Sequence, residues 1–274
     1  MEDIAPKLLE QIQLDFQSRF NKSEKIASLY ARIRDGTATY KEADAFAAEI
    51  GEILASVFKD NLSSNVLPDG KLYYNIAERI LRPTLGHNYE LVADVTVDVQ
   101  NILNKSAGIG IKAIKPEVNQ DRVQGIIDIA SGKEKYDDVA YILDEAVVNF
   151  TQSAVTDAVK ENADFQYKLG LSPKIVRTSS GKCCDWCEKI AGTYNYEEVR
   201  NTGNDVFRRH KNCVCLVELV AGKDIQNTHS KKIAYASDIK KRVSNSFTKG
   251  KELTRYTQEQ AKALEEKLRG TTKK

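Results

Sequence analysis

Two short clusters of metal-binding side chains stand near position 200. The first is Cys184-x-x-Cys187 and the second is His210-x-x-Cys213-x-Cys215. All five cysteines of the 274-residue chain lie between positions 183 and 215. A disulfide framework usually spreads its cysteines along the fold, whereas two clusters of soft ligands joined by a loop suit a tetrahedral zinc ion. The spacing therefore predicts a zinc site, with a disulfide or redox pair as the alternative.

Six side chains compete for four ligand positions. Cys184 and Cys187 are the expected ligands of the first cluster. Cys183 is interpreted as a buried or spare thiol, because adjacent cysteines rarely both reach one ion. In the second cluster, His210 with Cys213, His210 with Cys215, and the two cysteines without His210 all remain open. A closed set of four protein ligands predicts a structural ion, because catalytic zinc keeps a position for water.

Other polar residues offer little for catalysis. His87 and His229 lie outside the clusters, and Trp186 inside the first cluster is expected to shield the metal from water. The run Arg208-Arg209-His210-Lys211 is a local basic patch that could contact phosphate. Candidate contacts to phosphate or DNA, in this patch and further along the chain, are Arg208, Arg209, Lys211, Lys240, Lys241 and Arg242.

The composition predicts a folded protein with a basic C-terminal segment. Hydrophobic residues make up 41% and charged residues 29%, which allows a packed core. The N-terminal residues show no secretory signal, and no run of about 20 apolar residues predicts a membrane span. Reduced thiols fit synthesis in a cytoplasm. Residues 222–274 contain 14 Lys/Arg against 6 Asp/Glu, so they could bind nucleic acid or an acidic protein surface.

Hydrophobic periodicity predicts mostly helices. A stripe of apolar residues runs from Ile4 to Ile33, and Thr39-x-x-Glu42 has the form of a capping box that opens the next helix. Further helices are expected at 72–80, 89–104, 123–130, 136–169 and 256–268, with an interruption at 83–86. Strands are expected at 174–178 and 214–220.

The expected fold is α+β and predominantly α-helical, with a helical N-terminal part and a small zinc-stabilised α+β C-terminal region. We divide the chain into a helical region at 1–132, a long helix with zinc-bearing strands at 133–221, and a basic, partly helical tail at 222–274.

The segment from Phe150 to Cys215 resembles the C-terminal region of the Mu F-like phage head morphogenesis (minor capsid) proteins. The shared pattern is an alanine-rich helix ending near a glycine, a strand with Arg-Thr, a CxxC cluster followed by a glycine, and H-x-N-C-x-C. This chain supplies it as Ala154, Ala158, Ala163, Gly170, Arg177, Thr178, Cys184, Cys187, Ala191, Gly192, His210, Asn212, Cys213 and Cys215. Lys211 and Val214 depart from the residues that the family often has there.

The resemblance implies a low-copy component inside the head of a tailed phage or prophage, made in the bacterial host cytoplasm. Expected partners are portal and capsid or scaffold proteins and phage DNA during packaging or ejection, with no membrane and no small-molecule substrate. The resemblance implies no enzymatic activity. A zinc-fold nuclease or toxin is one alternative, although it would need histidines beyond the clusters to activate water. A zinc-dependent DNA-binding protein is another, although it would need a recognition helix after the second cluster.

Overall fold

The computed structural model describes residues 3–179, 184–202, 206–210, 213 and 215–221, together with two strands at 224–227 and 232–235. The chain forms two compact units. One contains residues 1–169 and 173–221, and the other contains residues 170–172 and 222–274.

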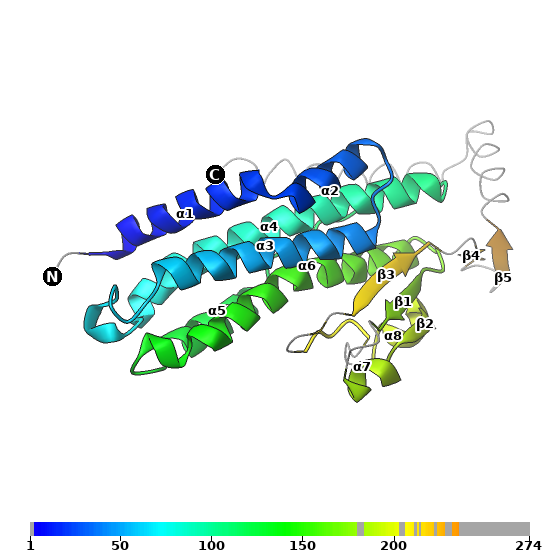
Figure 1. Cartoon of the computed structure of the whole chain (residues 1–274). Coiled ribbons are helices and arrows are strands. Elements are labelled where there is room, and N and C mark those ends of the chain that lie inside the picture. Colours follow the sequence, from blue (N-terminus) through cyan, green and yellow to red (C-terminus); the bar gives the residue numbers. More distant parts are fainter. Residues whose placement is uncertain are drawn as a thin grey trace, which may run out of the picture. The chain divides into compact units, whose positions relative to one another are not determined.

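The first unit is mainly helical and carries a small antiparallel sheet, as the sequence predicts. Helices α1, α3, α4 and α6 run side by side, and α5 packs against α4 and α6 (Figure 1). One continuous hydrophobic core joins them, so it includes residues from both sides of position 132. The helices are α1 (Ala5–Lys22), α2 (Glu24–Arg34), α3 (Tyr40–Asn61), α4 (Tyr74–Ser106), α5 (Gln120–Ser131) and α6 (Ala140–Lys168).

Local signals set several helix ends. Thr39 and Glu42 form the predicted capping box at the start of α3. The apolar stripe from Ile4 to Ile33 is divided into two helices at Ser23, whose hydroxyl accepts the backbone N–H of Ile26. The long helix expected at 136–169 begins later, at Ala140, because Tyr136–Asp138 forms a separate 3-10 turn.

The expected interruption at 83–86 is wrong, because α4 continues through Pro83. Proline removes one intrahelical hydrogen bond and costs about 3 kcal/mol in a helix interior. Here Pro83 is exposed, while Leu81, Leu85 and Tyr89 around it are fully buried. The hydroxyl of Thr84 also donates to the carbonyls of Ile80 and Leu81. Burial of the apolar face on both sides of the proline stabilises the helix across it.

Helices α3 and α6 approach each other closely at Gly51. A Cβ atom placed there would lie 2.8 Å from the Cα of Val148 on α6. The absent side chain lets the two backbones approach. This helix pair supports the segment that carries Cys213 and Cys215, which is described below.

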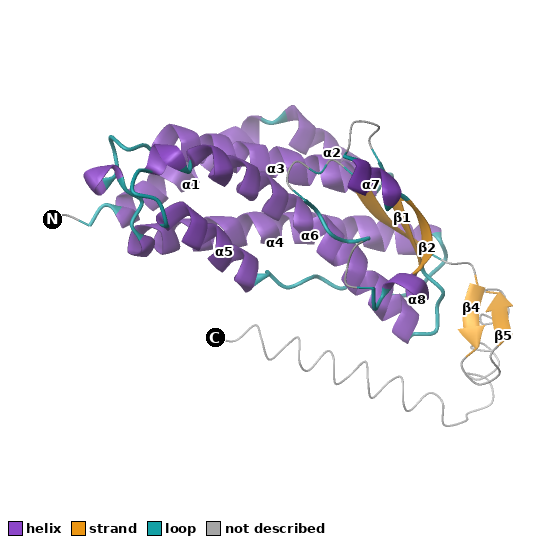
Figure 2. Cartoon of the chain, turned by 90° about the horizontal axis from the view of Figure 1, so that it is seen from below, coloured by secondary structure: helices purple, strands orange, loops and turns teal. Residues whose placement is uncertain are grey.

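A three-stranded antiparallel sheet lies at one end of the helices, beside α7 (Asp185–Lys189) and α8 (Tyr196–Val199) (Figure 2). Its order is β2 (Gly192–Asn195), β1 (Lys174–Thr178), β3 (Leu216–Val220), and Ile175 of β1 pairs with Tyr194 and Leu219. The strand predicted at 174–178 is confirmed, and the one predicted at 214–220 begins at Leu216. Strand β3 packs against α6 and α3, which places the sheet on the helices.

In the second unit, β4 (Asp224–Asn227) and β5 (Lys232–Tyr235) form an antiparallel pair. The helix predicted at 256–268 lies outside the described residues. Among the residues that are described, no helix has the length and apolar character needed to cross a membrane.

Candidate metal centre

The two clusters predicted from the sequence meet at one place in the first unit. Cys184 caps the N-terminus of α7 and Cys187 lies within this helix. His210 and Cys213 belong to the segment before β3, and Cys215 directly precedes that strand. Cys187, Cys213 and Cys215 are buried, whereas Cys184 is exposed. The fold thus brings five donors together from segments that are more than twenty residues apart.

The donors form two overlapping groups that share Cys187. Cys184, Cys187 and His210 have their ligand atoms within 4.8 Å of one another, and so do Cys187, Cys213 and Cys215. The Nε2 of His210 lies 3.3 Å from the Sγ of Cys184 and 2.8 Å from the Sγ of Cys187.

One sulfur–sulfur separation matches that of two ligands on a tetrahedral zinc ion. The Sγ atoms of Cys187 and Cys213 lie 3.8 Å apart. With Zn–S bonds of about 2.3 Å, two thiolates on one tetrahedral ion also lie about 3.8 Å apart. The cluster could therefore hold a metal ion, and a thiolate-rich set with one imidazole favours zinc among the common ions.

Arg177 of β1 is the residue around which the site is organised. Its side chain is 1% exposed, and its Nη2 lies 3.5 Å from the Sγ of both Cys187 and Cys213. Its Nη1 donates to the carbonyls of Val206 and Arg208. A buried cation needs compensating charge, and the two sulfur atoms supply it when they are thiolates.

The sulfur atoms differ in acidity before any metal binds. Burial raises the pKa of Cys187 and raises that of Cys215 to about 12. Burial also acts on Cys213, but the backbone N–H of Cys215 and the charges of Arg209 and Arg177 outweigh it and lower the pKa. Cys213 is thus the buried sulfur most easily ionised, and it faces the guanidinium of Arg177.

Trp186 covers one side of the cluster. Its ring meets the ring of His210 edge-on, with centroids 5.6 Å apart. The guanidinium carbon of Arg177 lies 5.5 Å from the centroid of the same ring. The half-buried indole thus contacts both residues, and the shielding role expected for it stays a prediction.

The expected phosphate contact at Arg209 is wrong, because this side chain points inward and is 2% exposed. Its Nη2 forms an ion pair with Asp44 of α3, its Nη1 donates to the carbonyls of Cys213 and Cys215, and its Nε donates to Thr156 of α6. The sequence could not reveal this role, because Asp44 and Thr156 are distant in the chain.

The other candidate residues lie elsewhere. Arg208 is exposed and stays available for a phosphate contact. His87 lies on α4, away from the cysteines. The remaining candidates lie outside the described residues: Cys183, Lys211, His229, Lys240, Lys241 and Arg242.

Asn149 of α6 is a further contact of the site, and no sequence motif points to it. Its Nδ2 donates to the carbonyl of His210 at 2.5 Å, and its Oδ1 accepts from Arg122 of α5. The backbone of the second cluster is therefore bonded directly to the helix bundle.

Comparison of the chain with protein-family models, curated proteins and solved structures gave no match.

Proposed function

We propose that this protein is a structural minor head protein of a tailed phage or prophage, without enzymatic activity, in which one zinc ion fastens the small sheet to the helix bundle. The observation that carries the zinc part of the proposal is the meeting of two three-donor groups at Cys187, one with Cys184 and His210 and the other with Cys213 and Cys215. Side chains of β1, α3 and α6 contact the same segment, so an ion there would hold parts of the first unit together.

The ligands in this proposal are Cys184, Cys187, His210 and Cys213. Cys213 is chosen over Cys215 because its sulfur lies 3.8 Å from that of Cys187 and receives a hydrogen bond from Arg177. Three thiolates and one Zn²⁺ leave one negative charge, which the guanidinium of Arg177 balances. Cys215 then stays a buried thiol. A complete set of four protein ligands leaves no position for a reactive water.

Elemental analysis and cobalt substitution test the zinc site. We expect about one zinc per chain and a tetrahedral thiolate spectrum with Co²⁺. Cys187→Ser and Cys213→Ser should lose the metal, whereas the matched variant Cys215→Ser should keep it. Full occupancy in Cys187→Ser, or loss of metal in Cys215→Ser alone, would refute the assignment.

The role in a phage head rests on the resemblance of residues 150–215 to the Mu F-like proteins. Its test is the set of neighbouring genes together with the protein content of purified heads. Portal, terminase and capsid genes nearby, and the chain inside DNA-filled heads, are the expected results. An isolated regulatory operon and absence from heads would contradict the role.

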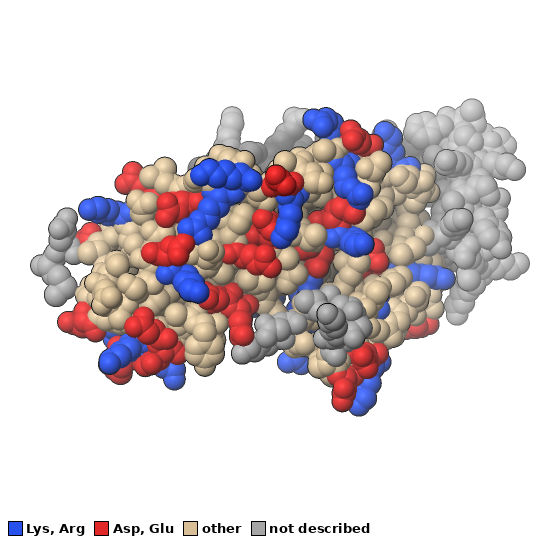
Figure 3. Space-filling model, in the orientation of Figure 1, with Lys and Arg blue, Asp and Glu red and all other residues tan. Residues whose placement is uncertain are grey.

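Contact with DNA is assigned to the C-terminal segment. On the face seen in Figure 3, Lys and Arg side chains alternate with Asp and Glu, so that face offers no broad positive surface. Residues 222–274 carry the positive excess. Replacing Lys240, Lys241 and Arg242 by Gln should weaken DNA binding and reduce its dependence on salt concentration. Unchanged binding at low salt would contradict the assignment.

Nuclease activity would overturn a structural role. It would be shown by cleavage of DNA or RNA with Mg²⁺ or Mn²⁺ that disappears in His210→Ala, while Cys215→Ser stays active.

A further inference from the structure

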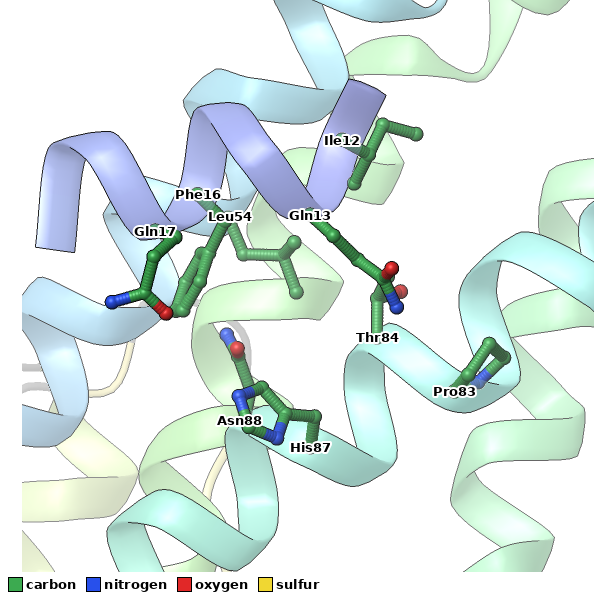
Figure 4. A pocket seen from close by; sticks show the side chains of 9 residues that line it. All are labelled: Ile12, Gln13, Phe16, Gln17, Leu54, Pro83, Thr84, His87 and Asn88. Atoms are coloured by element: carbon green, nitrogen blue, oxygen red, sulfur yellow. The ribbon is translucent and has the colours of Figure 1, made fainter. Parts of the chain in front are cut away.

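A cavity of about 190 Å³ is lined by residues of α1, α3 and α4 and is separate from the cysteine cluster. Phe16, Leu54, Thr84 and His87 surround an open space in Figure 4. The base of the cavity is apolar, since Ile12, Phe16 and Leu54 are almost completely buried.

The polar groups of the cavity are amides, a hydroxyl and one imidazole. They come from Gln13 and Gln17 on α1 and from Thr84, His87 and Asn88 on α4 (Figure 4). No Lys, Arg, Asp or Glu lines the space among the described residues. The lining therefore suits a ligand without net charge.

Asn88 presents one unused hydrogen-bond acceptor. Its side chain is 1% exposed, and its Nδ2 donates to the carbonyl of Ile50 at 3.2 Å. A carbonyl only accepts, so this bond fixes which end of the amide is nitrogen. The Oδ1 accepts no hydrogen bond from the part of the chain that the structure describes, and it stays open to the cavity. Because this oxygen is reached from the cavity, a ligand N–H can take the place of the water that would otherwise bond to it.

Two further groups can bind the edge of a ligand. Thr84 donates its hydroxyl proton to the carbonyl of Ile80, so its oxygen can only accept from a ligand. His87 stands at the exposed rim, where one ring nitrogen can donate. A suitable ligand needs an N–H next to a carbonyl on a flat apolar ring.

We propose that this cavity binds a neutral single-ring lactam of the pyrimidine-base type. A cavity of about 150 Å³ holds benzene, so 190 Å³ accommodates a six-membered ring with its carbonyl oxygens. The N–H of the ring donates to Asn88 Oδ1, an adjacent carbonyl accepts from His87, and the ring faces contact Phe16 and Leu54. The proposal does not depend on the zinc site or on a role in a phage head.

The test measures binding of uracil and benzene to the full-length protein by ligand-observed NMR. Uracil should bind and benzene should bind more weakly, because benzene leaves Asn88 without a donor. His87→Trp places a large ring at the mouth from an exposed position and should weaken uracil binding at least about tenfold. Tyr74→Trp, at a position 46% exposed on the same helix, is the matched control and should not change it.

Asn88→Leu provides a second readout, because it removes the acceptor and keeps the size of the side chain. We expect this variant to prefer benzene over uracil. Folding is checked by circular dichroism, and His87→Trp decides the question if Asn88→Leu does not fold. Absence of uracil binding at millimolar concentration, or equal binding of uracil by wild type and His87→Trp, would overturn the proposal.

The source of the base is decided by two further ligands, uridine and a short oligothymidylate. Tighter binding of the oligonucleotide, lost in His87→Trp, would indicate a base within single-stranded nucleic acid. Equal or tighter binding of uridine would indicate a free nucleoside. Either result supports the lactam site.

Discussion

The guanidinium of Arg209 and the carboxylate of Asp44 form an ion pair between the segment before β3 and helix α3. The side chain of Arg209 is 2% exposed and that of Asp44 is 18% exposed. The same guanidinium donates to the carbonyls of Cys213 and Cys215. One side chain thus fixes the backbone of the second cysteine cluster and attaches it to the helices.

Asp44→Asn should therefore lower the free energy of unfolding by about 3 kcal/mol, because it leaves a buried guanidinium without its counter-charge. Urea denaturation of the zinc-loaded protein measures this. Glu134→Gln breaks an ion pair with Lys71 at a position 90% exposed and should change the stability by less than about 1 kcal/mol. Equal effects of the two variants would show that the Arg209–Asp44 pair does not anchor the segment.

Arg177→Gln should weaken zinc binding by about 10- to 100-fold, the range found when a group that contacts metal ligands is removed. The glutamine keeps a hydrogen-bond donor but not the charge that balances the thiolates. Competition with a zinc chelator gives the affinity. Arg208→Gln, on the exposed neighbouring side chain, is the control and should bind zinc like the wild type. If both variants bind equally, Arg177 has only a packing role.

Much of the fold follows from local sequence, because the signals lie within one element. The strand at 174–178 alternates in burial as an extended chain must, and the Thr39-Glu42 capping box needs only residues three apart. The meeting of the two cysteine clusters could also be predicted, because a tetrahedral zinc ion needs ligands from both. These features need no knowledge of distant contacts.

The incorrect predictions have the opposite cause, because they depend on contacts between residues far apart in the sequence. Pro83 was expected to end a helix, but the helix is held by its packing on other helices, which no local pattern reveals. The basic run around Arg209 suggests a contact with phosphate, yet the side chain of Arg209 is buried and paired with Asp44. In the sequence Arg177 stands only as part of a strand motif, although in the structure it contacts two sulfur atoms. A lone arginine at a buried position of a short strand is the one signal that could have indicated it.

Gly51→Ala should destabilise the protein by about 1–3 kcal/mol, although alanine favours helices. The added Cβ would lie 2.8 Å from the Cα of Val148, and backbone atoms cannot move away as a flexible side chain can. Thermal unfolding measures the change. Gly125→Ala on α5 meets no atom within 4 Å and should stabilise the protein by up to about 1 kcal/mol. A stabilised Gly51→Ala would show that α3 and α6 are not in close contact.

Removal of the metal should loosen the cysteine segment and leave the main helices folded. Cys187, Cys213 and Cys215 form a small cluster of their own with Trp186, whereas the helices share the large core. After chelation, hydrogen exchange should become faster in α7 and residues 206–210, and the buried thiols should react with an alkylating reagent. Amides of α3 and α6 should stay protected. An identical exchange pattern with and without metal would rule out a structural ion.

Asp157→Asn should make the stability less dependent on pH. Burial raises the pKa of Asp157, although Tyr89 donates its hydroxyl to this carboxylate at 2.9 Å. A raised pKa means that the folded state favours the protonated acid. The resulting stability is complete below the ordinary aspartate pKa of about 3.9 and is lost as the pH rises through the higher pKa of the folded state. Relative to Asp157→Asn, the wild type should therefore lose stability as the pH rises above about 4. Urea denaturation across this range measures the difference.

The control Asp35→Asn, at a side chain 66% exposed, should follow the wild type. If the wild type instead gains stability relative to Asp157→Asn as the pH rises, then Tyr89 and the nearby cations outweigh burial and the carboxylate is the favoured form.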